Sequence, residues 1–200
     1  MSESLVFYFD FSSPYAYLAS EKIDDLAAKY GRKVKWRPIL LGPAFKTTGT
    51  APLTEIPVKG DYSRHDFARS ARFLGIPFRM PDKFPLATQV AARAYYWLHE
   101  QDCGLARAFA HAVFRALFVD NRDVSDPTLV LELAAGQGAD SVALAAALKS
   151  EVLKARLKME GDAALARGVF GAPFIFVGNE AFWGVDRLPQ IEQLLAEGGF

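Results

Sequence analysis

Patterns typical of β-strands occur only near the two ends of this 200-residue chain. Between the first two of them, residues 15–30 carry apolar side chains at helical spacing, and residues 61–167 show helical patterns only. A helical block cannot complete a sheet, and the terminal pieces are too small to fold alone. The order βαβ, helices, ββα therefore predicts one α/β domain with a helical insertion at residues 44–162. The predicted strands are residues 5–9, 34–39, 174–177 and 181–183.

Turn and cap residues mark where the predicted helices begin and end. Gly31 ends the first predicted helix, and Pro127 begins another, because proline suits a first helical turn. Glycines and prolines interrupt every periodicity in residues 40–60, which predicts a long loop. The other predicted helices are residues 63–74, 86–100, 105–118, 127–136, 141–148, 151–167 and 187–197.

Composition excludes several classes of protein. The 23 basic and 23 acidic residues give a formal net charge of zero, which disfavours nucleic acid as the main partner. Hydrophobic residues make up 51% of the chain, too many for a disordered protein. No apolar run has the roughly 18 residues of a membrane span, and Met1 to Ser4 include no basic signal-peptide region. With the single cysteine, Cys103, this pattern favours a cytoplasmic protein without disulfides.

Ser13 precedes Pro14 at the start of the first predicted helix. One interpretation is an N-cap, in which the serine oxygen accepts a hydrogen bond from a backbone N–H of the first turn. The other is an anion site, because the end of a helix with unpaired N–H groups stabilises negative charge, including that of a thiolate. The sequence leaves both interpretations open.

Two further motifs lie near the C-terminus. Ala172-Pro173 precedes a predicted strand, and a cis bond there would leave the Ala172 backbone N–H and C=O free to bind an extended peptide. Asp186 precedes the last predicted helix and is either its cap or the partner of a ligand ammonium group. His65, His99 and His111 are scattered without metal-ligand spacing or a carboxylate partner, so we expect no metal site.

Three segments together resemble one family over essentially the whole chain. They are residues 9–19 (FDFSSPYAYLA), 169–174 (VFGAPF) and 182–188 (FWGVDRL). They are similar to the signatures of 2-hydroxychromene-2-carboxylate isomerases and kappa-class glutathione transferases. The resemblance implies a thioredoxin-like fold with an inserted all-helical domain, in which residues 1–43 and 163–200 form the thioredoxin-like part and residues 44–162 form the insertion.

The resemblance also implies a glutathione site. Ser13 occupies the place of the first cysteine of redox relatives, and in this family its hydroxyl contacts the glutathione sulfur. Ala172, before the family's cis-proline Pro173, pairs with the cysteinyl backbone, and Lys59 matches a lysine near the glycyl carboxylate. The γ-glutamyl end of glutathione is expected to lie among Trp183, Gly184, Val185 and Asp186.

The substrate side of the site matches the family less well. Lys46 matches a position near the organic substrate. Thr50 and Ala51 stand where the family often has an asparagine, and other substrate-side residues are replaced around Phe84. The resemblance implies a cytoplasmic homodimer that acts on a small aromatic molecule with glutathione as cofactor.

Three functions remain open from the sequence. The first is a glutathione-dependent isomerase of aromatic catabolism, converting 2-hydroxychromene-2-carboxylate or a related unsaturated keto acid. The second is a kappa-like transferase that conjugates glutathione to an electrophile. The third is a non-enzymatic module that grips extended peptides at the Pro173 edge.

Overall fold

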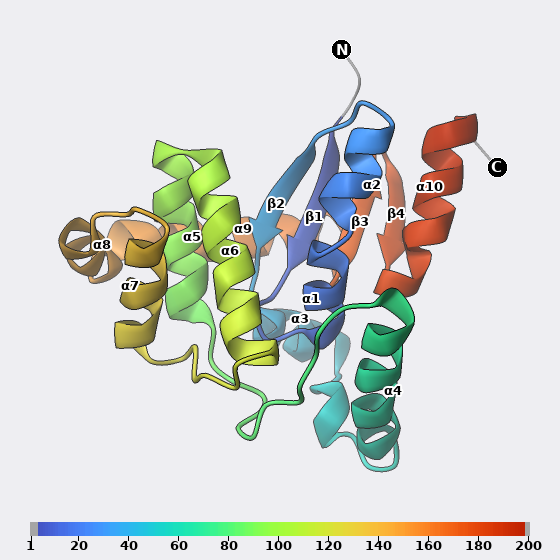
Figure 1. Cartoon of the computed structure of the whole chain (residues 1–200), viewed down its shortest axis with the longest axis horizontal. Coiled ribbons are helices and arrows are strands. Elements are labelled where there is room, and N and C mark those ends of the chain that lie inside the picture. Colours follow the sequence, from blue (N-terminus) through green and yellow to red (C-terminus); the bar gives the residue numbers. More distant parts are fainter. Residues whose placement is uncertain (1–3, 199–200) are drawn as a thin grey trace.

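Four strands form one mixed sheet in the order β2-β1-β3-β4 (Figure 1). The computed structural model describes residues 4–198. Met1 to Glu3, whose lack of basic residues argued against a signal peptide, lie outside the described residues, as do the last two residues of the predicted C-terminal part. The strands are β1 (Leu5–Phe9), β2 (Val34–Pro38), β3 (Phe174–Val177) and β4 (Glu180–Trp183).

Strand pairing joins the two ends of the sequence. β1 runs parallel to β2, with Leu5 opposite Val34, and antiparallel to β3, with Phe7 opposite Ile175. β3 and β4 form the predicted hairpin. Because β1 and β3 are neighbours, the segment that follows β1 and the segment that precedes β3 meet at one edge of the sheet.

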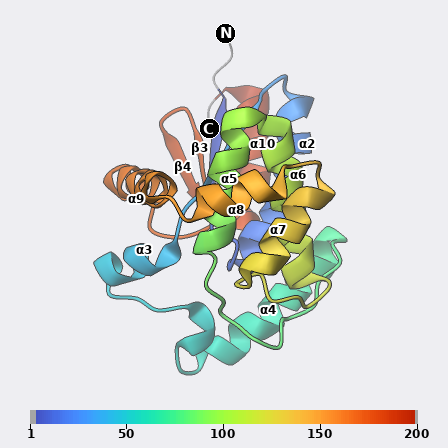
Figure 2. The same ribbon diagram turned by 90° about the vertical axis from the view of Figure 1, so that its left-hand side faces the viewer.

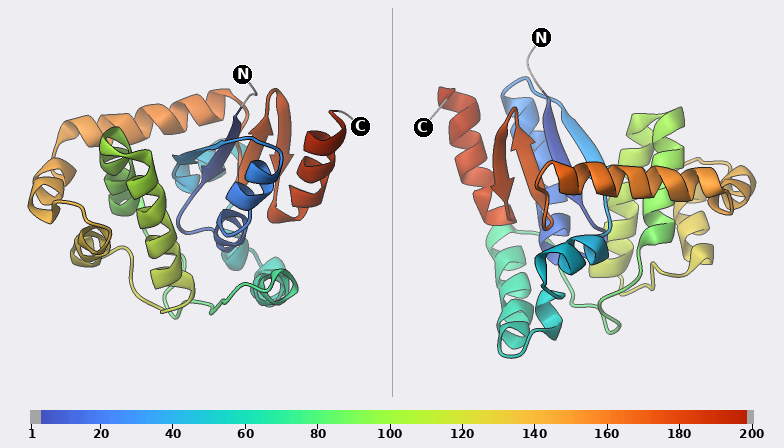
Figure 3. Two further views of the ribbon diagram at one scale, coloured as in Figure 1. Left: turned by 45° about the horizontal axis from the view of Figure 1, so that its top comes forward. Right: turned by 180° about the vertical axis from the view of Figure 1, so that it is seen from behind.

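Helices cover both faces of the sheet. α1, α2 and α10 lie on the front face in Figure 1, whereas α9 crosses the back with α3 below it (Figure 3, right). α5 to α8 gather beyond β2 (Figure 1) and face the viewer in Figure 2. The helices are α1 (Pro14–Ser20), α2 (Ile23–Lys29), α3 (Leu41–Thr48), α4 (Lys59–Leu74), α5 (Gln89–Gln101), α6 (Cys103–Phe118), α7 (Pro127–Gly136), α8 (Ser141–Leu148), α9 (Glu151–Ala166) and α10 (Leu188–Glu197).

A continuous aromatic core joins the sheet to the helices between β2 and β3. Phe9 of β1 is fully buried, and its ring lies 5.5 Å from that of Trp36, 5.9 Å from Tyr95 of α5 and 5.5 Å from Phe114 of α6. Aromatic pairs at such separations add to the stability gained by burial. The central strand and the helical segment therefore share one hydrophobic core.

The predicted first helix is two helices. α1 ends at Ser20 and α2 begins at Ile23. The intervening Glu21 accepts hydrogen bonds from His111 and Arg115 of α6, at 3.3 and 2.7 Å. The interruption between α1 and α2 coincides with the contact of Glu21 with α6, and no glycine or proline at residues 20–23 predicts it.

The predicted loop at residues 40–60 was wrong. It contains α3 and a single 3-10 turn, Leu53–Glu55. Gly42 and Pro43 suggested a break, but they occupy the second and third positions of α3, where backbone N–H groups have no intrahelical partner to lose. Similarly, α4 begins at Lys59, four residues before the predicted start at Ser63.

α7, α8 and β3 have the predicted boundaries. Asp126 and Asp140 cap the two helices by accepting hydrogen bonds from backbone N–H groups of the first turn. No helix among the described residues is long and apolar enough to span a bilayer.

Gly161, inside α9, offers a test of helix propensity. A Cβ built there meets no atom within 4 Å, so Gly161→Ala should raise the free energy of unfolding by about 0.5–1 kcal/mol. The matched control is Gly75→Ala at the C-cap of α4, where φ is +67° and an alanine is strained. Urea unfolding should show opposite signs for the two variants, and a destabilised Gly161→Ala protein would contradict the expectation.

Candidate active site

The Asp10 carboxylate organises the edge of the sheet where β1 ends. Asp10 is 3% exposed and accepts four hydrogen bonds. Its Oδ1 accepts from the backbone N–H of Ser12 at 2.9 Å, from the Ser12 hydroxyl at 3.0 Å and from the Thr88 hydroxyl at 2.7 Å. Its Oδ2 accepts from the backbone N–H of Leu41 at 2.8 Å. One buried anion thus ties the turn before α1 to the starts of α3 and α5.

Ser13 follows this turn and has the first of the two roles that the sequence left open, that of an N-cap. It caps α1, since its Oγ accepts from the backbone N–H of Ala16 at 3.1 Å. The same hydroxyl donates to the backbone carbonyl of Ala172 at 2.8 Å. Ser13 is 6% exposed, so its hydroxyl is fixed between the first helix and the segment before β3.

The bond between Ala172 and Pro173 is cis, the isomer that the resemblance implied. The expectation that the Ala172 carbonyl would be free was wrong, because it accepts the hydrogen bond of Ser13. The next carbonyl, that of Pro173, accepts from the backbone N–H of Gly184 at 3.0 Å. These contacts bring together Ser13, the cis peptide and the end of β4.

Trp183 and Phe170 form an exposed aromatic wall beside the cis peptide. Their rings lie 4.9 Å apart and are 54% and 41% exposed. Gly171 allows this arrangement, because a Cβ there would lie 2.4 Å from the indole Nε1 of Trp183. A glycine before the Ala172-Pro173 pair is therefore required by the position of the indole.

Asp186 is not the cap of the last helix, contrary to one of the two interpretations. Its carboxylate pairs with the side chain of Arg187 at 3.0 Å and is largely exposed. α10 has no side-chain cap. Gly184, two residues earlier, has φ of +111°, and a Cβ there would lie 2.3 Å from Oδ1 of Asp186. Val185, between them, is buried and contributes to the core.

Tyr15 belongs to this edge, and the sequence did not single it out. Its hydroxyl donates to Asp66 of α4 at 2.5 Å, and Asp66 also pairs with Arg69. Burial first, and then the Asp66 carboxylate, raise the pKa of Tyr15, with a smaller contribution from Asp186. Tyr15 therefore links α1 to α4 and lies within the electrostatic reach of Asp186.

Lys59 begins α4 immediately after a strained residue. Val58 has φ of +69° and ψ of −47°, and the backbone N–H of Lys59 donates to the Pro57 carbonyl at 2.8 Å. This is the geometry of a rare γ-turn, unfavourable for a β-branched residue, and such strain is concentrated at functional sites. The side chains of Val58 and Lys59 are both exposed.

The four predicted substrate residues are scattered. Lys46 is exposed on α3, and Thr50 follows the end of α3, where its hydroxyl lies 2.8 Å from that of Thr48. Ala51 is half-buried in the connection to the 3-10 turn. Phe84 lies elsewhere, with its ring 6.3 Å from that of Phe118. Among residues 4–198, no hydrogen bond or ring contact joins any of these four residues to Ser13.

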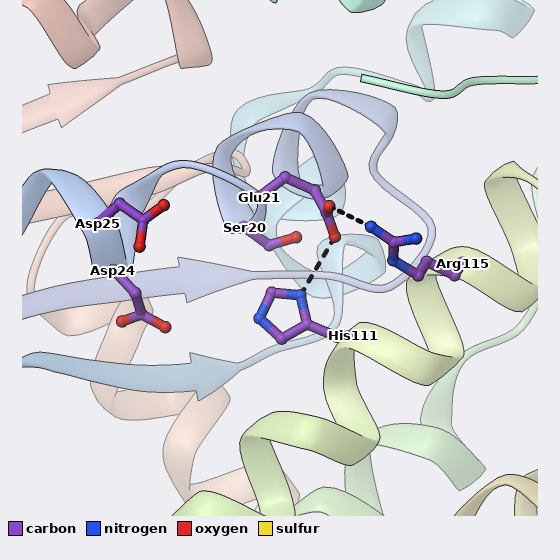
Figure 4. Close-up of a pocket in the computed structure, with 6 residues that line it drawn as sticks. All are labelled: Ser20, Glu21, Asp24, Asp25, His111 and Arg115. Atoms are coloured by element: carbon purple, nitrogen blue, oxygen red, sulfur yellow. Dashed lines mark hydrogen bonds and ion pairs between the residues drawn. The ribbon is translucent and has the colours of Figure 1, made fainter. Parts of the chain in front are cut away.

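A polar cavity of about 300 Å³ lies at the far end of α1 from Ser13 (Figure 4). In it, Glu21 bridges His111 and Arg115, so the expectation that no histidine has a carboxylate partner was wrong for His111. The hydrogen bond from His111 is the largest influence on the pKa of Glu21, which is lowered. Among residues 4–198, no cluster of histidine, cysteine or acidic side chains has the arrangement of a metal site.

The class of the protein follows from its fold. The sheet has the order β2-β1-β3-β4, the bond before Pro173 is cis, and Ser13 caps the first helix. A family model described as a DsbA-like thioredoxin domain matches residues 4–196. The thioredoxin-like fold with a helical insertion, expected from the sequence, is therefore confirmed.

Curated relatives narrow the class. A 2-hydroxychromene-2-carboxylate isomerase of Sphingobium xenophagum is 32% identical over 98% of this chain and 100% of its own. Glutathione S-transferase kappa 2 of Caenorhabditis elegans is 26% identical over 96% of this chain and 91% of its own. A solved structure of a 2-hydroxychromene-2-carboxylate isomerase superposes with a TM-score of 0.88 at 30% identity, covering 97% of this chain and 95% of that one. The chain is an enzyme that belongs to the 2-hydroxychromene-2-carboxylate isomerase family.

The Asp10 network predicts a large stability effect. Asp10→Asn replaces one accepting oxygen by a donor and removes the charge, so it should lower the free energy of unfolding by about 2–4 kcal/mol. Asp25→Asn is the matched control, since Asp25 is exposed and should change stability by less than about 0.5 kcal/mol. Urea midpoints measure both, and equal midpoints for the two variants would refute the role of Asp10.

Proposed function

We propose that this enzyme is a glutathione-dependent isomerase. Its substrate is 2-hydroxychromene-2-carboxylate or a related unsaturated aromatic keto acid, and its product is the trans-hydroxybenzylidenepyruvate-type isomer. The observation that carries the proposal is the Ser13 hydroxyl, held 2.8 Å from the Ala172 carbonyl beside a cis-proline. A serine rather than a cysteine stands there, so Ser13 can hold a sulfur but cannot exchange disulfides with it.

Two exposed charged side chains and the surface beside Ser13 support the binding of a tripeptide thiol. Glutathione carries an ammonium group at one end and a carboxylate at the other. Asp186 and Lys59 supply opposite charges on exposed side chains. The extended backbone of the tripeptide would lie along the exposed indole of Trp183 and the peptide at Ala172, which Ser13 contacts.

Ser13 would act by exchanging its hydrogen-bond acceptor. In the structure its proton points to the Ala172 carbonyl. With a sulfur in place, rotation about the Cβ–Oγ bond would turn the proton from the carbonyl to the sulfur, and a hydrogen bond to a charged acceptor is about twice as strong as a neutral one. Bound glutathione would supply a thiolate that adds reversibly to the unsaturated acid, so that the former double bond turns as a single bond before the thiolate leaves unchanged.

Removal of the hydroxyl should raise the pKa of the bound thiol. In Ser13→Ala we expect a rise of about one unit, equivalent to about 1.4 kcal/mol, and a fall in kcat of about tenfold. Ser13→Gly should raise the thiol pKa in the same way. Glycine at an N-cap costs little stability, so this variant tests the loss of the hydroxyl without the loss of the helix cap. The ultraviolet absorbance of the thiolate, titrated in the complex, measures the pKa.

Ser20→Ala, at the opposite end of α1, is the control and should leave the thiol pKa unchanged. An unchanged pKa in both Ser13 variants would refute the assigned role of Ser13. Recovery of glutathione after turnover supports the isomerase, whereas its stoichiometric loss would favour the transferase activity in the name of the kappa relatives. Binding of an extended peptide without binding of glutathione would favour the non-enzymatic module.

The exposed apolar side chains near the start and the end of α4 support a homodimer. Phe73 is 88% exposed, Val58 90% and Tyr62 62%. Contiguous exposed apolar patches often mark protein–protein interfaces. We expect a cytoplasmic dimer that covers this face, and Phe73→Asp should shift it to monomer in sedimentation velocity. The control is Arg72→Asp, a neighbouring exposed position. A monomeric wild-type protein at micromolar concentration would contradict the dimer.

A further inference from the structure

A second cavity, of about 190 Å³, is lined by residues of α9, of α3, of the connection from β2 to α3 and by Arg93 of α5. α9 and α3 lie on the back of the sheet (Figure 3, right). None of the residues assigned above to glutathione or substrate lines it. Its inner walls are apolar: Ile39, Ala44, Leu157 and Val169 are each at most 4% exposed. The volume corresponds to about six water molecules, enough for a single ring and too small for a tripeptide.

Arg93 of α5 is one of the residues that line this cavity. Its Nε is buried and has no hydrogen-bond partner among the residues that the structure describes. Arg93 forms no ion pair with any described residue either, whereas the other two cations that line the cavity, Lys154 and Lys158, are paired. Lys154 holds Glu151 at 2.6 Å and Lys158 holds Asp162 at 2.5 Å. A guanidinium partly withdrawn from water without a partner is costly, and an anion would offset that cost.

The charges around the cavity favour an anion. Arg93, Lys154 and Lys158 line it together with a single carboxylate, Asp162. The charge of Arg93 contributes slightly to lowering the pKa of Glu151, but Glu151 is exposed and Lys154 is its main partner. Because Glu151 and Asp162 pair with the two lysines, the unpaired Arg93 leaves one positive charge in excess, and an anion that enters the cavity meets this planar donor group.

We infer that this cavity binds a small monocarboxylate that carries one apolar ring. Its carboxylate would accept two parallel hydrogen bonds from the Arg93 guanidinium, a geometry that a planar fork of donors favours. Its ring would occupy the space between Ile39 and Leu157. A phosphate or a halide lacks the ring, and a neutral amide lacks the charge, so neither uses both features of the cavity.

Calorimetric titration with sodium benzoate tests this site. We expect wild-type protein to bind benzoate, and Arg93→Met to bind it at least tenfold more weakly. Arg72→Met is the matched control, because Arg72 is exposed on α4 and does not line the cavity, and it should bind as wild type. Benzamide, which is neutral, should bind wild type at least tenfold more weakly than benzoate.

A cavity-filling variant keeps the test independent of Arg93. A Cβ at Gly161, which lines the cavity, meets no atom within 4 Å, so Gly161→Leu should fold and occupy the space. It should abolish benzoate binding while its Tm is maintained or raised. Equal affinity in wild type and Arg93→Met, or full binding by Gly161→Leu, would overturn the proposal.

The glutathione site provides the last control. Saturating glutathione should leave benzoate affinity unchanged, and Ser13→Gly should bind benzoate as wild type does. Displacement of benzoate by glutathione would place the anion at the Ser13 edge and would overturn the cavity assignment. The proposed isomerase activity is tested separately by the thiol pKa, so either proposal can fail alone.

Discussion

The carboxylate of Asp10 is the interaction on which the arrangement of the site depends. Four donors from three separate segments converge on it at 2.7 to 3.0 Å in a buried environment. Such a group is expensive to bury unless every acceptor site is used, and each donor is in turn unsatisfied if the carboxylate is lost. The turn of Ser13, the start of α3 and the start of α5 are therefore fixed as one unit.

The sheet adds the second half of the site. Antiparallel pairing of β3 with β1 places the segment before β3 next to the segment after β1, and so brings the cis peptide to Ser13. The aromatic core around Phe9 joins this sheet to α5 and α6, which prevents the helical segment from moving independently of the site. Tyr15 and Asp66 connect α4, and with it Lys59, to the same edge.

Local chemistry made much of the secondary structure predictable. α7 and α8 begin after aspartate caps that lie one residue before the helix, and β3 is a short apolar run after a proline. Where the prediction failed, the deciding interaction was with a residue distant in sequence, or glycine and proline were wrongly taken to exclude a helix. At the start of α3, the backbone N–H of Leu41 donates a hydrogen bond to Asp10. After the end of α1, Glu21 accepts hydrogen bonds from side chains of α6. Neither partner is visible in a local window.

The residues proposed to bind glutathione were named from motifs, but the contacts between them were not predicted. The sequence marked Ser13 and Ala172 separately, while Tyr15 and Asp66 left no pattern to detect, because a tyrosine and an aspartate 51 positions apart are ordinary residues until folding brings them together. The second cavity was equally invisible. In the sequence, nothing distinguishes Arg93 from the other arginines in predicted helices. Only the packing of the folded chain leaves its Nε buried without a hydrogen-bond partner.

By itself, the sequence determined that a serine followed by a proline stands at the start of the first helix and that this sequence has a single cysteine, because both depend only on residue type and immediate neighbours. Only the tertiary structure decided that the Ser13 hydroxyl donates to a carbonyl 159 positions away, that Asp186 faces solvent rather than capping α10, and that Asp10 is a hub. Hydrogen bonds of this kind depend on distances between segments, and those distances exist only once the sheet and its core have formed.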